Sequence, residues 1–172
     1  GACWCASDTT RIIAQQVVGS VTFNNQQGCS QVASDQQLTM DVMAGYAANP
    51  NIYGTVVVSL GCENCQMDLV VKAIQERTNK PLKQVIIQEA GGTLKAIDMA
   101  VRYAKEMVEE ASMLQKEEFP MSELIIGTEC GGSDPTSGLA ANPLIGQLSD
   151  LIVKEGGTSI LSETTEFIGI AD

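Results

Sequence analysis

Residues 123–143 read ELIIGTECGGSDPTSGLAANP, and this stretch shows how the chain is built. An apolar run, Leu124 to Ile126, ends at Gly127, and a polar loop with one cysteine and two adjacent glycines follows. This order predicts a buried strand that ends in a loop with many free backbone N–H groups. At the carboxyl end of a parallel strand, such a loop is where ligands bind.

The same order of strand, loop and helix recurs along the chain. The continuous β-branched run GTVVVSL at 54–60 predicts a strand buried on both faces. Apolar residues at three- and four-residue spacing predict helices between the strands. The predicted strands are 20–24, 54–60, 84–88, 124–126 and 158–161. The predicted helices are 9–18, 36–48, 67–77, 94–115 and 144–155.

This alternation predicts an α/β fold, namely an open, mostly parallel sheet with helices on both faces in a Rossmann-like three-layer sandwich. We expect residues 1–172 to form a single domain. Cys3 and Cys5 stand directly before a predicted helix, without a strand ahead of them, so the chain is expected to be a fragment of a longer protein.

Charge and composition exclude several classes of partner. Ten basic and twenty-one acidic residues give a net charge of −11, which argues against a nucleic-acid surface or an anionic membrane. The longest apolar runs have the length of strands, so we expect no membrane span and a cytoplasmic location. An anionic substrate would need a bound cation or oriented backbone dipoles to overcome this negative field.

The chain has six cysteines and no histidine. A chain of this length does not need a disulfide framework, so we expect reduced thiols. Without histidine, acid–base chemistry falls to carboxylates, lysine, tyrosine or thiolate. A single cysteine usually packs as a small hydrophobe. All six, however, fall at the edge of the predicted sheet toward which the strands point, which favours a shared functional role.

Other motifs are less specific. The Cys-x-x-Cys pair of Cys62 and Cys65 is a moderate metal or redox signal, but no second pair stands at the spacing of a zinc ribbon. The glycine pairs at Gly91 and Gly131 could be simple turns. Neither of them matches a dinucleotide fingerprint or a P-loop, so a nucleotide site is not favoured.

Several longer motifs, taken together, resemble the altronate and galactarate dehydratase family, which also includes the large subunit of sulfolactate sulfo-lyase. They occur in order along nearly the whole chain: GCSQ (28–31), SLGCEN (59–64), ECGGSD (129–134), TSGLAANP (136–143), LSDLIVKEGGT (148–158) and SETTEFIG (162–169). The resemblance implies an iron-dependent lyase domain that eliminates water from a hydroxy acid, or sulfite in the sulfo-lyases. Members of the family are longer at both ends.

The resemblance also implies roles for individual residues. Such an elimination needs a cation to stabilise the enediolate, together with one base and one acid. Thiolates suit ferrous iron, so the expected Fe²⁺ ligands are Cys29, Cys62 and Cys130. The expected catalytic carboxylates are Glu63, Glu129 and Asp134, and Glu63 and Glu129 are alternatively ligands of the metal. The expected substrate-binding residues are Gln27, Gly131, Gly132, Ser133, Thr136, Ser137, Asn142 and Glu166.

Two positions depart from the family pattern. Asn25 and Gln36 stand where relatives carry histidine, which bears on metal binding and on the substrate. Expected partners are a small hydroxy acid, the remaining domains or a small subunit of the full enzyme, and a second copy of the chain. Alternatives to a dehydratase are sulfite elimination, a non-catalytic iron–sulfur or redox module, and a structural module. Another divalent metal or an iron–sulfur cluster is the alternative to Fe²⁺.

Overall fold

The computed structural model describes residues 1–169 and divides the chain into two compact units, 1–114 and 115–172. The sequence analysis expects one domain, and the physical reason for the difference lies at residues 112–120. These residues are all exposed, and Lys116, Glu117 and Glu118 among them favour water over a shared core.

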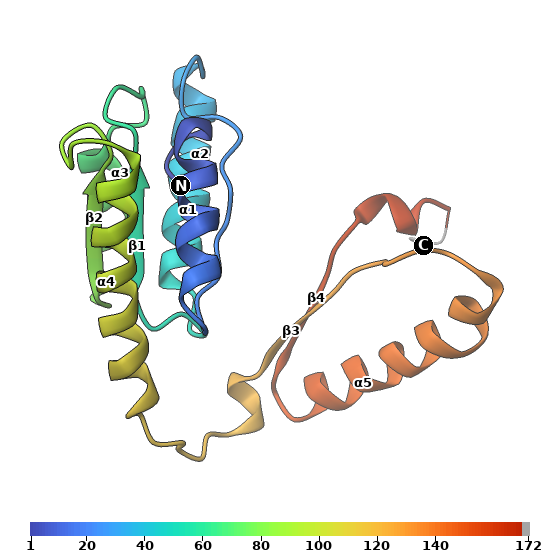
Figure 1. The fold of residues 1–172 in the computed structure, drawn as a ribbon. Helices are drawn as coiled ribbons and strands as arrows, with labels where there is room; N and C mark the ends of the chain where they lie inside the picture. The colour runs from blue at the N-terminus through green and yellow to red at the C-terminus, as the bar shows by residue number, and fades with distance from the viewer. Residues whose placement is uncertain (170–172) are drawn as a thin grey trace. The chain divides into compact units, whose positions relative to one another are not determined.

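The first unit is built on two parallel strands, β1 (Thr55–Ser59) and β2 (Leu82–Ile86). The two strands lie side by side in Figure 1, and Thr55 is opposite Leu82 and Ser59 opposite Ile86. Val57 and Val58 are both buried, on opposite faces of the strand. The β-branched run therefore forms the doubly buried strand that the sequence predicts.

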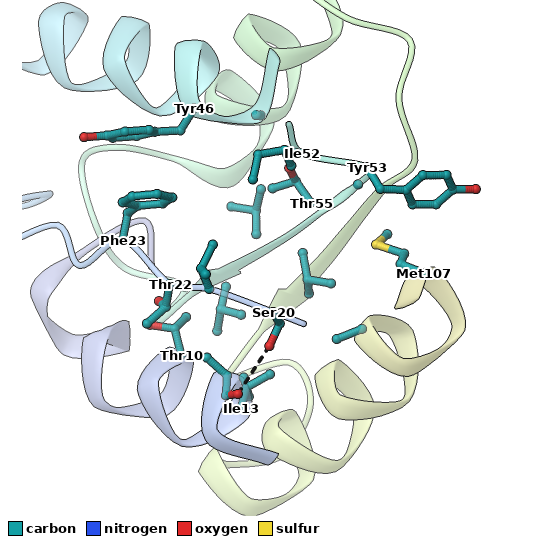
Figure 2. A pocket seen from close by; sticks show the side chains of 18 of the residues that line it. Thr10, Ile13, Ser20, Thr22, Phe23, Tyr46, Ile52, Tyr53, Thr55 and Met107 are labelled. Carbon is teal, nitrogen blue, oxygen red and sulfur yellow. Dashed lines mark hydrogen bonds between the residues drawn. The ribbon is translucent and has the colours of Figure 1, made fainter. Parts of the chain in front are cut away.

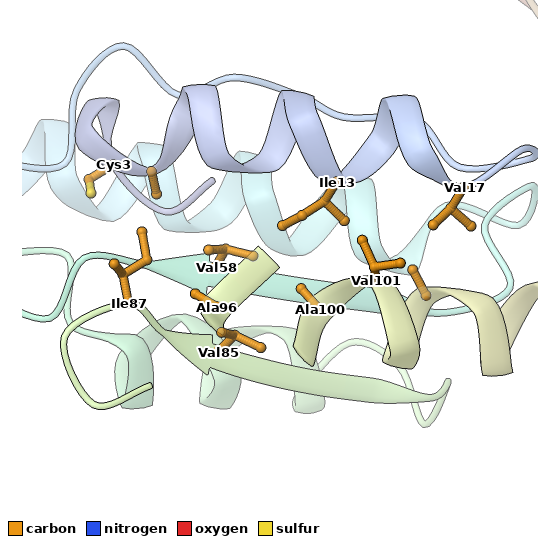
Figure 3. Packing of buried hydrophobic residues seen from close by; sticks show 11 residues of the cluster. Cys3, Ile13, Val17, Val58, Val85, Ile87, Ala96, Ala100 and Val101 are labelled. Carbon is orange, nitrogen blue, oxygen red and sulfur yellow. The ribbon is translucent and has the colours of Figure 1, made fainter. Parts of the chain in front are cut away.

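Helices cover both faces of this sheet. On one face, α1 (Trp4–Gln16) and α4 (Thr93–Ser112) pack on Val58 and Val85, with Ala96 and Ala100 of α4 fully buried (Figure 3). On the other face, α2 (Ala33–Ala48) and α3 (Met67–Gln75) pack on Val57. The expected three-layer α/β arrangement is therefore confirmed within this unit.

The predicted strand at 20–24 is wrong for the described structure. Residues 20–24 are an extended coil without a strand partner, and Val21 and Phe23 remain exposed. The ring of Phe23 stacks on that of Tyr46, with centroids 4.1 Å apart. A strand needs a neighbour to bond to, and a cavity separates this segment from β1. The pattern of apolar and polar residues carries no information about that cavity.

The second unit holds a second parallel pair, β3 (Ile125–Thr128) and β4 (Thr158–Leu161), in register from Ile125 opposite Thr158. The connection runs through a π-helical turn, η2 (Ser137–Ala141), into α5 (Asn142–Lys154). Short 3₁₀ turns lie at η1 (Met121–Glu123) and η3 (Thr164–Phe167). The chain thus contains two separate two-stranded sheets among residues 1–169, where the sequence predicts one.

Helix starts differ from expectation by a few residues. α1 begins at Trp4, before the predicted start at residue 9, so Ser7 lies inside the helix and its hydroxyl donates to the Cys3 carbonyl at 3.4 Å. Thr93 is the first residue of α4, and Gly92 precedes it as the cap. Within residues 1–169, no helix combines the length and apolarity that crossing a bilayer requires.

Candidate active site

The loop that follows β1 is organised around a buried carboxylate. Glu63 is 5% exposed, and its two oxygens accept N–H bonds from Leu60 at 3.1 Å, Gly61 at 2.7 Å and Cys62 at 3.0 Å. Gly61 has a φ of +115°, a conformation that favours glycine and lets the chain wrap around the carboxylate. Glu63 therefore fixes the loop that presents the exposed thiol of Cys62.

The loop that carries Cys29 contacts this first loop. The N–H of Cys65 donates to the carbonyl of Gly28 at 3.1 Å, which joins the two segments. Gly28 has a φ of +108°, and a Cβ there would lie 2.5 Å from the Cβ of Cys3. The structure thus brings together the loops of Cys29 and Cys62, and both of these thiols are exposed.

The two amides that are expected to stand in place of family histidines, Asn25 and Gln36, have structural partners. The Asn25 side chain donates to Ala2 O at 3.0 Å and accepts from Gln27 N at 3.0 Å. The Gln36 amide donates to Asn64 O, across to the loop after β1. Both side chains therefore tie loops together at this edge. Gln27, a predicted substrate-binding residue, is exposed beside Asn25.

Two of the six thiols are buried. Burial, together with a smaller effect of the nearby Glu63 carboxylate, raises the pKa of Cys65 to about 11. Burial also raises the pKa of Cys3. A raised pKa disfavours the thiolate, which is the form that binds a metal. Neither residue is among the predicted ligands, and all six cysteines are free thiols, as expected.

In the second unit, the loop after β3 is held by a glutamate from the loop after β4. Cys130 N donates to the Glu163 carboxylate at 2.8 Å, and Cys130 Sγ lies 3.7 Å from Ser133 Oγ. Parallel pairing of β3 and β4 places both loops at one edge. Glu163 is not among the predicted site residues, although it lies in the loop after a predicted strand, within SETTEFIG.

Asp134 organises the turn that leads into η2. One of its carboxylate oxygens accepts from Thr136 N at 2.7 Å, from the Thr136 hydroxyl and from Ser137 N at 3.0 Å. These bonds hold the pKa of Asp134 below its usual value, the Thr136 hydroxyl contributing most. Asp134, Thr136 and Ser137 were each predicted as site residues, and the structure brings them together by bonding them to one another.

The remaining predicted residues of the second unit are exposed, or their side chains lie outside the described part. Glu129, Ser133 and Asn142 are exposed, and a Cβ at Gly131 or Gly132 would meet nothing within 4 Å. Glu166 lies in η3, and its side chain is outside the description. The backbone at the two glycines is therefore open to a ligand.

Neither unit completes a metal site from its own described residues. Within each unit, no three Cys, Asp or Glu side chains gather around a common point. Cys29 and Cys62 belong to the first unit and Cys130 to the second, so the geometry of one unit does not test that ligand set. The thiol ligands remain a prediction.

A polar cleft of about 290 Å³ lies at the carboxyl ends of β1 and β2. Glu63 is the one predicted site residue that lines it. The sequence analysis did not single out its other polar lining residues, which are Gln66, Asp68, Gln84 and Glu89. Gln66 and Asp68 follow the Cys62 loop at the start of α3, where a ligand-binding loop typically leads into its helix.

Comparisons with known proteins agree on one family. Residues 2–112 match the family model described as D-galactarate dehydratase/Altronate hydrolase, second domain. Residues 121–172 match D-galactarate/Altronate dehydratase, C-terminal. No solved structure matches the chain significantly.

Curated relatives cover most of the chain. An altronate dehydratase of Bacillus subtilis is 36% identical over 149 residues, which are 87% of this chain and 29% of the relative. The beta subunit of a (2R)-sulfolactate sulfo-lyase of Chromohalobacter salexigens is 34% identical over 91% of this chain and 39% of its own length. A galactarate dehydratase of Escherichia coli is 35% identical over 69% of this chain and 24% of its own length. The chain thus spans well under half of these relatives.

Proposed function

Because the chain belongs to the D-galactarate dehydratase/altronate hydrolase family, we propose that it carries part of an active site that eliminates water from a hydroxy acid of the altronate or galactarate type. One observation supports this most. In each unit, an exposed cysteine follows a parallel strand, and a glutamate carboxylate holds the N–H of that cysteine. The pairs are Cys62 with Glu63 and Cys130 with Glu163. Rigid loops of this kind preorganise groups for catalysis.

The reaction would take a proton from the carbon next to the substrate carboxylate and release the neighbouring hydroxyl as water. One group must accept the first proton, and another must donate a proton to the leaving oxygen. Glu129 is the stronger choice for the base, since its exposed carboxylate accepts no hydrogen bond from residues 1–169. Glu63 and Asp134 are already committed to neighbouring N–H groups.

The substrate carboxylate needs donors in a protein of net charge −11. The open N–H groups at Gly131 and Gly132 and the side chains of Ser133 and Asn142 would supply them. Ferrous iron bound by Cys29, Cys62 and Cys130 would add the charge that stabilises an enediolate.

Sulfite elimination is the second candidate. It is supported by the similarity to the sulfo-lyase subunit over 91% of this chain. The remaining parts of a longer enzyme, or a small subunit, would be partners in either case. A redox or iron–sulfur module and a purely structural module are outcomes that the assay below separates from a lyase.

The test compares three substrates under anaerobic conditions with added ferrous iron. Altronate, galactarate and sulfolactate are supplied separately, both to this chain alone and to a longer protein that adds the proposed remaining domains, and the released 2-oxo acid or sulfite is measured. We expect the sugar acids to yield a 2-oxo-3-deoxy acid. Glu129→Gln should lower turnover about 10²- to 10⁴-fold, whereas Glu117→Gln, in the exposed segment between the units, should not.

Sulfite release from sulfolactate without dehydration of the sugar acids would reject the dehydratase function and support the sulfo-lyase function. Inactivity of the longer protein on all three substrates would reject a lyase function. In that case, visible absorbance together with acid-labile sulfide would identify a cluster-binding module. Colourless, inactive protein would identify a structural one.

A further inference from the structure

Strand β1 has one edge that no other strand covers among the described residues. Thr55, Val57 and Ser59 turn their backbone groups toward β2, as the bonds Thr55 N to Pro81 O and Ile87 N to Ser59 O show, both at 2.9 Å. Val56 and Val58 therefore present theirs at the opposite edge. There, the structure records one bond, from Ala2 N to Val58 O at 2.8 Å. A strand buried on both faces, as β1 is, normally lies inside a sheet.

A cavity of about 360 Å³ runs along this open edge. Residues 55–58 of β1 and residues 19–23 of the extended coil both line it, with Ile13 of α1 and Tyr46 of α2 (Figure 2). Since α1 and α2 pack on opposite faces of the sheet, a space that both line lies in the layer of the strands. Its walls are mainly apolar.

The first residues of the chain enter this layer between the two segments. Gly1 N lies 3.4 Å from Phe23 O, Trp4 N donates to Gln27 O at 2.8 Å, and Ala2 bonds to Val58 on the other side. Backbone bonds on both sides are what a central strand makes. Gly1 itself lines the cavity, and burial there lowers the pKa of its amine to about 6.

We propose that the cavity holds one further β-strand, which runs parallel to β1 into Gly1 and pairs with β1 on one side and with residues 20–24 on the other. A strand fits because neighbouring strands lie about 4.8 Å apart and bond through both edges. Its side chains would alternate between the apolar walls formed by α1 and by α2. The result is an open parallel sheet with α1 and α4 on one face and α2 and α3 on the other. Its strand order is residues 20–24, the added strand, β1 and β2.

The strand is supplied by polypeptide joined to Gly1. Residues 1–4 already follow the path that such a strand would take. The matched relatives have the length to provide it, since the chain spans 24–39% of the relatives described above. A strand from a second molecule would have to stop against the Gly1 amine. A continuous strand passes through that point without a charge.

Amide hydrogen exchange tests this pairing. The N–H groups of Val56 and Val58 face the cavity, and that of Val57 bonds to β2, so Val57 is the internal control. In the 172-residue chain, Val56 and Val58 should exchange at least about a hundredfold faster than Val57. In a chain extended upstream of Gly1 by its natural sequence, all three should exchange at similar rates. Fast exchange of Val56 and Val58 in the extended chain would overturn the proposal.

Two proline variants give a second measurement. Phe23 O faces the cavity, so the N–H of Val21 faces it too and that of Thr22 faces away. In the extended chain, Val21→Pro removes a pairing N–H and should lower the urea midpoint of unfolding more than Thr22→Pro does. Equal effects would contradict the pairing. Concentration-dependent protection of Val56 in the 172-residue chain, with dimers in solution, would instead assign the edge to a second copy and overturn the proposal.

Discussion

The carboxylate of Glu163 accepts a hydrogen bond from the backbone N–H of Cys130 at 2.8 Å, across 33 positions of sequence. The parallel pairing of β3 with β4 makes this possible, because it brings the loops after both strands to one edge. Glu163 adopts a left-handed conformation, with φ +59° and ψ +61°, which few residues other than glycine adopt. Its backbone is thus set in an uncommon geometry while its side chain holds the Cys130 loop.

Replacing Glu163 by alanine should loosen the Cys130 loop. A hydrogen bond from a backbone N–H to a charged acceptor slows local opening, so its removal should speed exchange of the Cys130 amide about tenfold. Glu163→Gln keeps a carbonyl acceptor and should change the rate less. The control is Glu123→Ala in η1, which should leave the Cys130 amide unaffected. An unchanged rate in Glu163→Ala would show that the bond does not order the loop.

Replacing Glu63 should cost stability as well as order. Its carboxylate is buried and accepts three N–H bonds, and Glu63→Ala leaves those donors without partners. We expect the free energy of unfolding to fall by about 2–4 kcal/mol, measured by urea denaturation. The free energy of unfolding of Glu63→Gln should lie between those of the wild type and Glu63→Ala, because the amide nitrogen of glutamine cannot accept a hydrogen bond. The exposed Glu76→Ala, at the end of α3, should cost less than about 1 kcal/mol; a similar cost at both sites would contradict the assigned role of Glu63.

The six thiols should divide by reactivity. Cys5, Cys29, Cys62 and Cys130 are exposed, whereas Cys3 and Cys65 are buried with raised pKa values. At pH 8, a disulfide reagent should modify four thiols quickly in the native protein and the other two only on unfolding. Mass spectrometry of the modified peptides identifies them. Fast modification of Cys65 in native protein would contradict its burial.

The raised pKa of Cys65 also predicts a pH dependence. Between an ordinary thiol pKa of 9.0 and the native value of about 11, the folded state holds a proton that the unfolded state has lost. The contribution of the Cys65 thiol to the free energy of unfolding is therefore fully present below pH 9 and is lost as the pH rises toward 11. Cys65→Ala should reduce this alkaline loss, measured by urea unfolding at several pH values. Cys5→Ala, at an exposed thiol, should retain it.

Gly28 should not tolerate a side chain. Its φ is +108°, and the Cβ of an alanine would lie 2.5 Å from the Cβ of Cys3 and 2.7 Å from its Cα, neither of which can move easily. We expect Gly28→Ala to destabilise the first unit by about 3 kcal/mol or more, because strain and overlap add. Gly131→Ala meets nothing within 4 Å and should have little effect. Thermal unfolding of both variants checks this difference.

Sequence patterning predicted the elements whose periodicity is strong. β4 matches its predicted bounds of 158–161, and the strands around Val57 and Val85 and helices α2 to α5 lie within a few residues of prediction. The strand prediction for residues 20–24 was wrong because hydrogen-bond pairing, and not alternation of apolar residues, decides whether an extended segment becomes a strand. The chain also divides at exposed charges near Glu117, which no periodicity marks.

The site was predicted at the level of loops. The sequence placed cysteines and carboxylates after strands, and the structure joins the Cys29 and Cys62 loops and bonds Asp134 to Thr136 and Ser137. The sequence does not reveal that the Glu63 side chain turns inward to its own backbone, because that conformation depends on the φ of Gly61. The role of Glu163 was not predicted for a similar reason, since its partner, Cys130, is distant in sequence.

The parallel register of β1 and β2 has a consequence for how such domains diversify. Val57, Val58 and Val85 carry the packing, whereas Gln66 and Asp68 stand beyond the strand ends and line the polar cleft. Exchanges at the cleft positions therefore alter what a ligand meets without disturbing the interior. A library randomised at Gln66 and Asp68 should remain mostly folded while its ligand preference varies, and one randomised at Val58 and Val85 should mostly fail to fold.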